Sequence, residues 1–225
     1  MRVDTPDSLS TSASPFPNFL VRRFPSASLD KQLKRSEQGE TRRSQILAAA
    51  LDLFVEKGFA GTKIADIADA VGMSIGLLFH YFESKEQPYE ELVRIGRERA
   101  LEAMTATPEE PLAYFETVAE LILGRAKSDP FVAKMFVFMS QAAYSELVPE
   151  ETRNYLRRAV FEQSAGLIRA GQAAGTIRDG DPVALSVAFW ASIQGICHAL
   201  ALDRDLPCPE SGWVVDLLQS KGSGT

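Results

Sequence analysis

The sequence predicts an all-α protein of about nine helices, and three observations support this fold class. From Thr41 onward, apolar residues recur at the three-to-four-residue spacing of helices that bury one face. No segment shows the strict alternation of apolar and polar residues that is typical of a half-buried strand. Proline, alone or after aspartate, opens several of the periodic segments, as expected for the first turn of a helix.

The first 38 residues are rich in Ser and Pro and have no apolar period, so we expect residues 1–38 to form a flexible arm. Residues 19–43 carry seven basic side chains against three acidic ones. Either this segment is a solvated linker, or its positive charge follows the phosphates of a nucleic acid. The net charge of −6 does not exclude the second possibility, because residues 1–100 hold 14 Lys and Arg and 14 Asp and Glu.

Residues 39–84 are predicted to form a three-helix domain. The first helix has an apolar face and ends at Gly58 in a C-cap position. A second short helix follows Thr62, which we expect to be its N-cap, and Gly72 ends it. Ser74 caps a third helix that runs to about Phe82.

Residues 85–220 are predicted to form a helical second domain. Its helices are expected at Ser84–Thr105, Pro111–Lys127, Pro130–Tyr144, Pro149–Ala174, Asp181–Asp203 and Glu210–Gln219.

The second and third helices have the spacing of a helix-turn-helix, with the tight turn at Gly72. Leu78 and Phe82 are four residues apart and are expected to point to the core. Gly76 costs up to about 1 kcal/mol inside a helix, so we expect its backbone to approach DNA or a neighbouring helix closely.

Residues 42–92 resemble the DNA-binding domain of TetR-family regulators. The resemblance is carried by Thr62, Ile67-Ala68, Val71-Gly72-Met73-Ser74, Gly76, Leu78-Phe79-His80-Tyr81-Phe82 and Ser84-Lys85-Glu86. It implies that Thr62, Tyr81 and Lys85 contact phosphates. The full set of DNA-binding residues that we expect is Thr62, Ser74, Ile75, Gly76, Leu77, Phe79, His80, Tyr81 and Lys85.

The chain departs from the family pattern at three positions of the third helix. Where many members have Lys, Thr and Tyr, it has Ile75, Leu77 and Phe79. We therefore expect base reading to depend on apolar packing against thymine methyl groups. His80 either donates to a base or phosphate or is a packed surface residue.

Residues 183–202 contain no Asp, Glu, Lys or Arg, a length that also suits a membrane span. Polar residues interrupt the stretch and no positive cluster flanks it, so a buried dimer helix explains it better and no membrane partner is expected. The resemblance implies a homodimer formed by the last two long helices. The expected interface residues are Ile193, Gly195, Ile196, Leu200 and Trp213.

The middle of the chain is dense in aromatic residues and Met. These residues form either a plain core or the lining of a pocket for a small hydrophobic effector. The expected lining comprises Phe115, Phe131, Met135, Phe138, Met139, Phe161, Phe189, Trp190 and Gln194.

No residue pattern predicts an enzyme, a metal site or a cofactor: the two histidines lie in different domains, and no phosphate loop or serine elbow occurs. Two cysteines are too few for a disulfide framework and favour a cytoplasmic location. The sequence therefore predicts a transcriptional repressor that binds double-stranded operator DNA and is released by an effector. Two alternatives stay open: control through protein partners, and a ligand-binding module whose helix-turn-helix no longer binds DNA.

Overall fold

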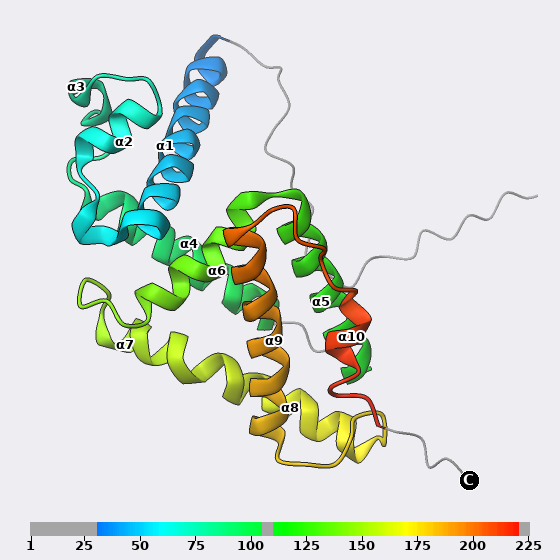
Figure 1. Ribbon diagram of the computed structural model, residues 1–225. Helices are drawn as coiled ribbons and strands as arrows, with labels where there is room; N and C mark the ends of the chain where they lie inside the picture. The colour runs from blue at the N-terminus through cyan, green and yellow to red at the C-terminus, as the bar shows by residue number, and fades with distance from the viewer. Residues whose placement is uncertain (1–30, 105–109, 221–225) are drawn as a thin grey trace, which may run out of the picture.

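In the computed structural model, the described residues are 31–104 and 110–220, with side chains from 41–100 and 110–220. They form helices throughout, with one isolated β-bridge between Ile177 and Gln219 (Figure 1). The elements are α1 (Lys31–Gly61), α2 (Ile64–Ala70), α3 (Ile75–Leu78), α4 (Glu86–Met104), α5 (Pro111–Ser128), α6 (Pro130–Ala142), α7 (Glu150–Asn154), the π-helical turn η1 (Tyr155–Ala159), α8 (Val160–Ala173), α9 (Pro182–Leu202) and α10 (Ser211–Val215). Counting α7, η1 and α8 as one continuous helix, the described residues contain the nine helices that the sequence predicted. The all-α fold class is confirmed.

The break in α1 at Gly58 is confirmed, since this glycine has a φ of 70°, a left-handed value that a side chain would strain. The helix begins earlier than predicted, at Lys31, so residues 31–38 belong to α1 and their assignment to the arm is wrong. The remainder of the predicted arm, residues 1–30, lies outside the described residues.

The helix-turn-helix is formed by α2 and α3, with Gly72 at a φ of 64° in the turn. The hydroxyl of Ser74 accepts a hydrogen bond from the Leu77 N–H at 3.2 Å, so the predicted cap is confirmed. The third helix is shorter than predicted: after Leu78 the chain tightens, and the Tyr81 N–H donates to the Leu78 carbonyl three residues back.

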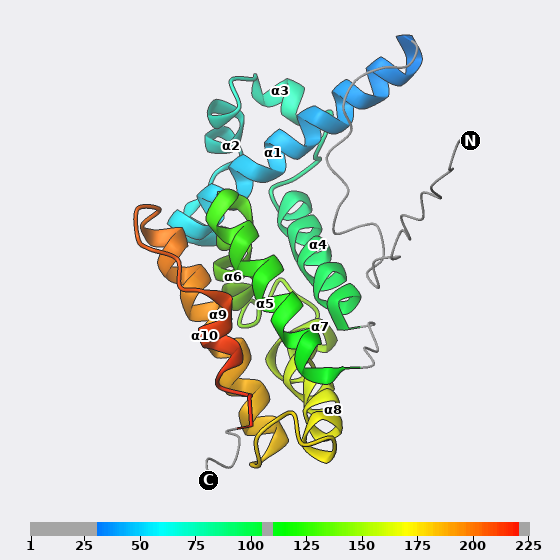
Figure 2. The same cartoon turned by 90° about the vertical axis from the view of Figure 1, so that its right-hand side faces the viewer.

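The core of the first domain extends into the second domain. It contains Ile46, Leu47, Ala50, Leu51, Phe54, Ile67, Ala68, Leu78, Phe82, Tyr89, Leu92, Val93, Phe138, Ala142 and Val148. The last three of these residues belong to α6 and the loop that follows it. Because the apolar cluster is continuous, α1, α4 and α6 pack together where the two domains meet (Figures 1 and 2).

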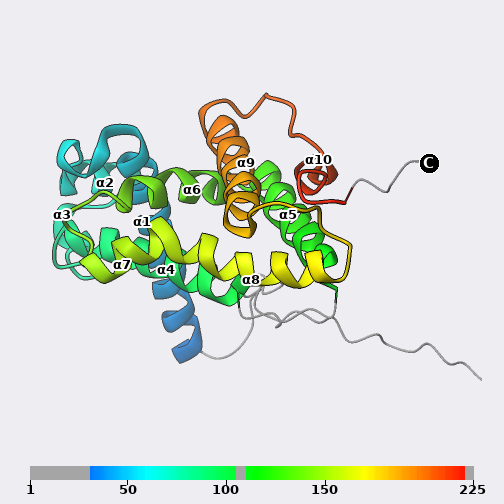
Figure 3. The same ribbon diagram turned by 90° about the horizontal axis from the view of Figure 1, so that it is seen from below.

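The second core lies among α5, α8, α9 and α10. Three aromatic rings at its centre meet edge to face: the ring centroids of Phe115 and Phe189 are 4.9 Å apart, and those of Phe189 and Trp190 are 5.3 Å apart. The Trp190 indole N–H donates to the Ser164 hydroxyl at 2.7 Å, which satisfies its polar atom inside the core. Seen from below, α8 passes beneath α9 and α5, and α10 lies beside α5 (Figure 3).

The end of the described chain is held against the linker between α8 and α9. The Arg178 N–H donates to the Leu218 carbonyl at 2.8 Å, and the Ser220 N–H donates to the Thr176 carbonyl at 3.2 Å. Gly175 begins this linker with a φ of 74°. We call these paired segments, residues 175–178 and 218–220, the terminal clip.

Helix α9 is long and apolar enough to cross a membrane by length and composition alone. In the fold it packs against α5, α6, α8 and α10, with Phe189 and Ile193 fully buried. This packing favours a helix that belongs to the folded core over a membrane span, while the predicted role of α9 in a dimer stays a prediction.

Candidate nucleic-acid interface

The short helix α3 packs on the first core through one side and is exposed on the other. Leu78 and Phe82 are fully buried, whereas Ile75, Leu77 and Phe79 are 42%, 46% and 45% exposed. We call these three exposed residues the α3 apolar face; Leu77 lies on one flank of it and Ile75 and Phe79 lie on the other, because residues two apart on a helix do not point the same way. Helix α3 lies at the outer end of the molecule, where nothing else in the described chain covers it (Figures 1 and 2).

Gly76 lies on the same exposed side of α3. A Cβ atom added there would meet no atom of the described chain within 4 Å. The expectation that Gly76 allows close approach of a neighbouring helix is therefore wrong, and close approach to DNA remains the proposal. His80 is exposed, and Tyr81 is half-buried against the first core.

Thr62 and Lys85 fasten the end of α1 to the start of α2. The Thr62 hydroxyl donates to the carbonyls of Gly58 and Leu53, at 2.8 and 3.1 Å. Lys63 rather than Thr62 is the N-cap of α2, so the predicted capping role of the threonine is wrong. The physical reason is that the hydroxyl is buried and directed at the Gly58 and Leu53 carbonyls of α1, so it is turned away from the first turn of α2.

The Lys85 ammonium donates to the carbonyls of Phe59 and Thr62 at 2.7 and 2.8 Å. It also lies 4.0 Å from the centroid of the Phe59 ring, a cation–π contact. Two of its three donors are thus directed inward, and one remains for another partner.

A shallow hollow of about 420 Å³ adjoins the α3 apolar face. Its lining residues are Ala60, Thr62, Lys63, Ile64, Phe79, Glu83, Ser84 and Lys85. Its lining holds two lysines against one glutamate, Glu83, so the hollow carries a net positive charge next to the apolar face. The first turn of α4 beside it already holds a carboxylate, because hydrogen bonds from the Ser84 hydroxyl and the Glu86 backbone lower the pKa of Glu86.

Two further contacts join the domains, and sequence reasoning missed both. Lys134 of α6 forms an ion pair with Asp52 of α1 at 2.7 Å. Arg43 of α1 pairs with Glu91 of α4 and lies 4.3 Å from the centroid of the Phe82 ring. The residues of each ion pair are far apart in sequence, so no local pattern could have identified them.

Eight of the nine predicted pocket residues divide between the two cores. Phe138, Phe131, Met135 and Met139 belong to the first core or pack against it, whereas Phe115, Phe161, Phe189 and Trp190 belong to the second. Phe138, Phe115 and Phe189 are fully buried in direct ring contacts. These three rings therefore pack within the two cores, and their role in lining a ligand site stays a prediction.

Gln194, the remaining pocket residue, belongs to a polar group between α6 and α9. Its amide donates to the Ser140 hydroxyl at 2.5 Å, and the His198 Nε2 atom lies 3.4 Å from the same oxygen. Ser140 in turn donates to the Phe136 carbonyl at 2.8 Å. All three side chains are half-buried, so this group lies at the edge of the seam between the helices.

Where α4 faces the π-helical turn, two buried polar atoms have no partner: Arg97 Nε and the Tyr155 hydroxyl. The guanidinium carbon lies 5.8 Å from the Tyr155 ring centroid. Burial raises the pKa of Tyr155, and the charge of Arg97 opposes that shift. A π-turn is often found at functional sites, and these donors stand between the helix leading to the DNA-binding domain and α8.

A second hollow, of about 490 Å³, lies on α5 and is lined by Thr117, Glu120, Leu121, Gly124, Arg125 and Ser128. None of the predicted pocket residues lines it. Its lining is mixed polar and apolar and comes from one helix.

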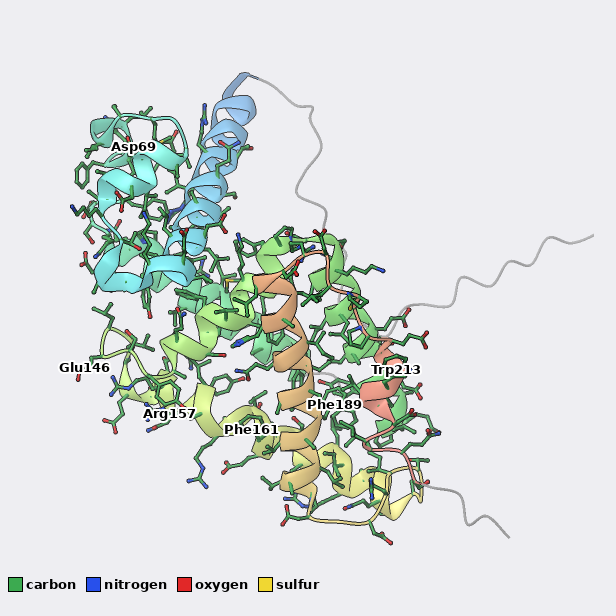
Figure 4. All side chains as sticks on the ribbon, viewed as in Figure 1. Asp69, Glu146, Arg157, Phe161, Phe189 and Trp213 are labelled. Atoms are coloured by element: carbon green, nitrogen blue, oxygen red, sulfur yellow. The ribbon has the colours of Figure 1, made fainter. Side chains whose placement is uncertain are left out.

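Two predicted dimer-interface residues are wrong. Ile193 and Leu200 are 0% and 2% exposed within a single protomer, because α9 turns them toward its own core. Gly195 is exposed, Ile196 is half-buried and Trp213 is 64% exposed at the outer side of α10 (Figure 4). The exposed side of α9 consists mainly of small residues: Ala184, Ala188, Ala191 and Gly195, with Val183, Val187 and Leu202 beside them.

Comparisons with known proteins agree with this architecture. Residues 46–92 match the family described as bacterial regulatory proteins, tetR family. The transcriptional regulator RutR of Escherichia coli K12 is 33% identical over 163 residues, which cover 72% of this chain and 76% of RutR. The transcriptional repressor KstR2 of Mycolicibacterium smegmatis is 29% identical over 70% of this chain and 80% of its own.

Solved structures share the fold at lower identity. The TetR-family regulator PfmR of Thermus thermophilus superposes with a TM-score of 0.57 at 24% identity, covering 76% of this chain and 93% of its own. AibR, solved with isovaleryl coenzyme A and operator DNA, superposes with a TM-score of 0.56 at 18% identity, covering 78% and 94%.

Proposed function

Because this chain belongs to the TetR family and is thus a DNA-binding transcriptional regulator, we propose that it is a cytoplasmic homodimeric repressor that a small hydrophobic effector releases from its operator. The proposed DNA contacts are the α3 apolar face together with Ser74, Gly76, His80 and Tyr81, while Thr62, Lys63 and Lys85 border the phosphates. The observation that carries the control by an effector is the shared core of α1, α4 and α6.

Helix α6 contacts the DNA-binding domain directly. Phe138 lies against both Phe54 of α1 and Tyr89 of α4, with ring centroids 6.2 and 4.9 Å apart. The Lys134–Asp52 ion pair adds a polar link between α6 and α1. A shift of α6 therefore moves α1 and the helix-turn-helix that packs on it.

The other side of α6 faces α9 through the Ser140 group, so α6 stands between the DNA-binding domain and the second core. Met135 and Met139 of α6 are half-buried and flexible, which suits a site that opens for ligands of varied shape. The solved complex of AibR with a ligand and operator DNA is a precedent in the same fold. The ligand changes DNA affinity only by its different affinity for the two states, typically about 1–3 kcal/mol.

The proposed dimer uses the exposed side of α9, around Gly195. Small side chains there permit close helix–helix packing between two copies. Trp213 of α10 is also exposed, and we include it in the proposed interface.

The decisive experiment is a titration of labelled DNA from upstream of the chain's own gene, followed by fluorescence anisotropy. We expect tight, salt-sensitive binding by a dimer. Hydrophobic compounds selected by thermal shift are then titrated with and without this DNA. An inducer binds more weakly in the presence of DNA by the same factor by which it weakens DNA binding.

One alternative retains the regulator and replaces the effector by a protein partner. Compounds that bind equally well in both titrations, with tight DNA binding preserved, favour this alternative. If the chain binds no DNA sequence more tightly than another, the helix-turn-helix does not read an operator, and the proposal is wrong.

A further inference from the structure

The exposed apolar side chains of the α3 apolar face lie where a regulator normally presents polar groups to DNA. Ile75, Leu77 and Phe79 fall within five consecutive residues and are each more than two-fifths exposed. No other run of five described residues exposes three large apolar side chains. Burial of such side chains is favourable, and the described protein leaves these uncovered.

Local structure fixes the direction in which this face points. Leu78 and Phe82 hold α3 to the core from one side, and the Ser74 cap fixes its first turn. Gly76 adds no side chain between Ile75 and Leu77, and the space next to it is open. Ile75 and Leu77 are two residues apart and point to opposite flanks of α3, with Gly76 between them. A partner that fits between these flanks can therefore approach the backbone at Gly76 closely.

Few polar side chains that could hydrogen-bond bases lie in the same segment. Between residues 74 and 81 the polar side chains are those of Ser74, His80 and Tyr81. The Ser74 hydroxyl already accepts from the Leu77 N–H, and Tyr81 is half-buried. Ser74 keeps its O–H as a donor, and His80 is the other exposed polar side chain of this segment that can hydrogen-bond a base.

The chemistry of the major groove then identifies what the α3 apolar face can recognise. Base edges there present hydrogen-bond donors and acceptors and a single apolar group, the C5-methyl of thymine. Lys63 and Lys85 line the hollow next to Phe79 and outnumber its one acidic residue, Glu83. The hollow therefore places a net positive charge beside the apolar face, where a DNA phosphate would lie.

Resting on the proposed function, we propose that Ile75, Leu77 and Phe79 read the operator through thymine methyl groups. Each half-site therefore contains thymines at the positions that face α3, and Leu77 contacts one of them. Specificity comes from the apolar contact, whereas His80 adds the hydrogen bond.

The test uses the full-length protein and an operator obtained by selection from a random duplex library. Each thymine of the half-site is replaced in turn by deoxyuridine, which keeps the base pair and removes the methyl group. We expect about a fourfold loss of affinity at each contacted thymine, because one buried methylene-sized group contributes about 0.8 kcal/mol. Thymines outside the half-sites should show no loss.

A double-mutant cycle assigns the contact to Leu77. In Leu77→Ala, deoxyuridine at the thymine contacted by this residue should cost nothing further, while the other thymines keep their effect. Leu147→Ala is the matched control, because Leu147 is 41% exposed in the loop between α6 and α7, away from α3. It should leave every deoxyuridine effect unchanged.

The outcomes separate this inference from the proposed function. If selection enriches a site and no deoxyuridine lowers affinity by more than twofold, methyl reading is overturned while the regulator stands. A selected site whose half-sites contain no thymine overturns methyl reading in the same way. If selection enriches no site at all, sequence-specific binding itself fails and both proposals fall.

Discussion

The ring of Phe138 in α6 stacks on the ring of Phe54 in α1, with centroids 6.2 Å apart and an interplanar angle of 29°. Both side chains are fully buried, and Tyr89 of α4 closes the group with edge contacts to each ring. One aromatic cluster therefore belongs to both domains. A change in this cluster should affect the stability of both, and a shift of one domain should move the other.

The first prediction follows from this cluster. Phe138→Ala should lower the free energy of unfolding by about 3–5 kcal/mol, because it opens a cavity between rings that cannot collapse onto each other. Denaturant titration measures the loss. Tyr144→Ala is the control: Tyr144 is 77% exposed just beyond α6, and its removal should change stability by less than about 0.5 kcal/mol. Equal effects of the two variants would contradict the shared core.

The second prediction distinguishes the structural role of Lys85, which hydrogen-bonds two carbonyls, from the electrostatic role of Lys63 at the basic hollow. Lys85→Ala should weaken binding to all DNA sequences and also destabilise the domain by about 1–3 kcal/mol, since its ammonium serves two carbonyls. Lys63→Ala, at an exposed position of the same hollow, should reduce the slope of log affinity against log salt by about one without loss of stability. Salt-dependent anisotropy and thermal melts give both quantities. If Lys85→Ala left the stability unchanged, its hydrogen bonds to the Phe59 and Thr62 carbonyls would not stabilise the domain.

The third prediction concerns assembly. Gly195→Glu should convert the proposed dimer into a monomer, because it places a charged side chain on the exposed side of α9, where the two copies are proposed to pack closely. Gly124→Glu on α5 is the matched control, since both glycines are exposed in helices and open space surrounds both. Light scattering after gel filtration gives the mass of each. A folded Gly195→Glu dimer would move the interface to another surface.

The fourth prediction uses the two cysteines. Burial raises the pKa of Cys197 to about 12, so its thiol stays protonated and shielded in the folded chain. Cys208 is half-buried, so an aromatic disulfide reagent at pH 8 should label one thiol per folded chain, at Cys208. Peptide mapping identifies the site. Rapid labelling of Cys197 in the native state would contradict its burial.

The raised pKa of Cys197 also makes the free energy of unfolding depend on pH. The unfolded chain ionises this thiol at its ordinary pKa of about 9, while the folded chain does not until about pH 12. The free energy of unfolding should therefore fall as pH rises above 9, and Cys197→Ser should remove this contribution. Denaturant titrations at pH 8 and pH 10 measure the difference between the two proteins.

Sequence reasoning succeeded where the structure obeys local rules. The breaks at Gly58 and Gly72 follow from backbone conformations that glycine adopts without strain, and the Ser74 cap follows from one side chain and the next turn. The long helices of the second domain were also predicted to within a few residues, because proline fixes their starts. Four-residue spacing was enough to place Leu78 and Phe82 in the core.

It failed where partners are distant in sequence. Asp52 and Lys134 are 82 residues apart, and nothing near either residue indicates the other. Helix α9 is apolar on all sides, so its pattern could not tell which residues its own protomer would cover, and Ile193 and Leu200 were placed on the wrong side. Thr62 was predicted to be the N-cap of α2 because the sequence does not reveal that its hydroxyl donates to the Gly58 carbonyl instead.

The terminal clip has a practical consequence for labelling the protein in cells. It holds Ser220 beside the turn between α8 and α9, at the opposite end of the molecule from α3 (Figure 1). A fluorescent protein fused after residue 225 is therefore tethered away from DNA and should leave operator binding intact. Shortening the chain before Leu218 would instead remove both hydrogen bonds of the clip, so fusion junctions belong after the clip and not within it.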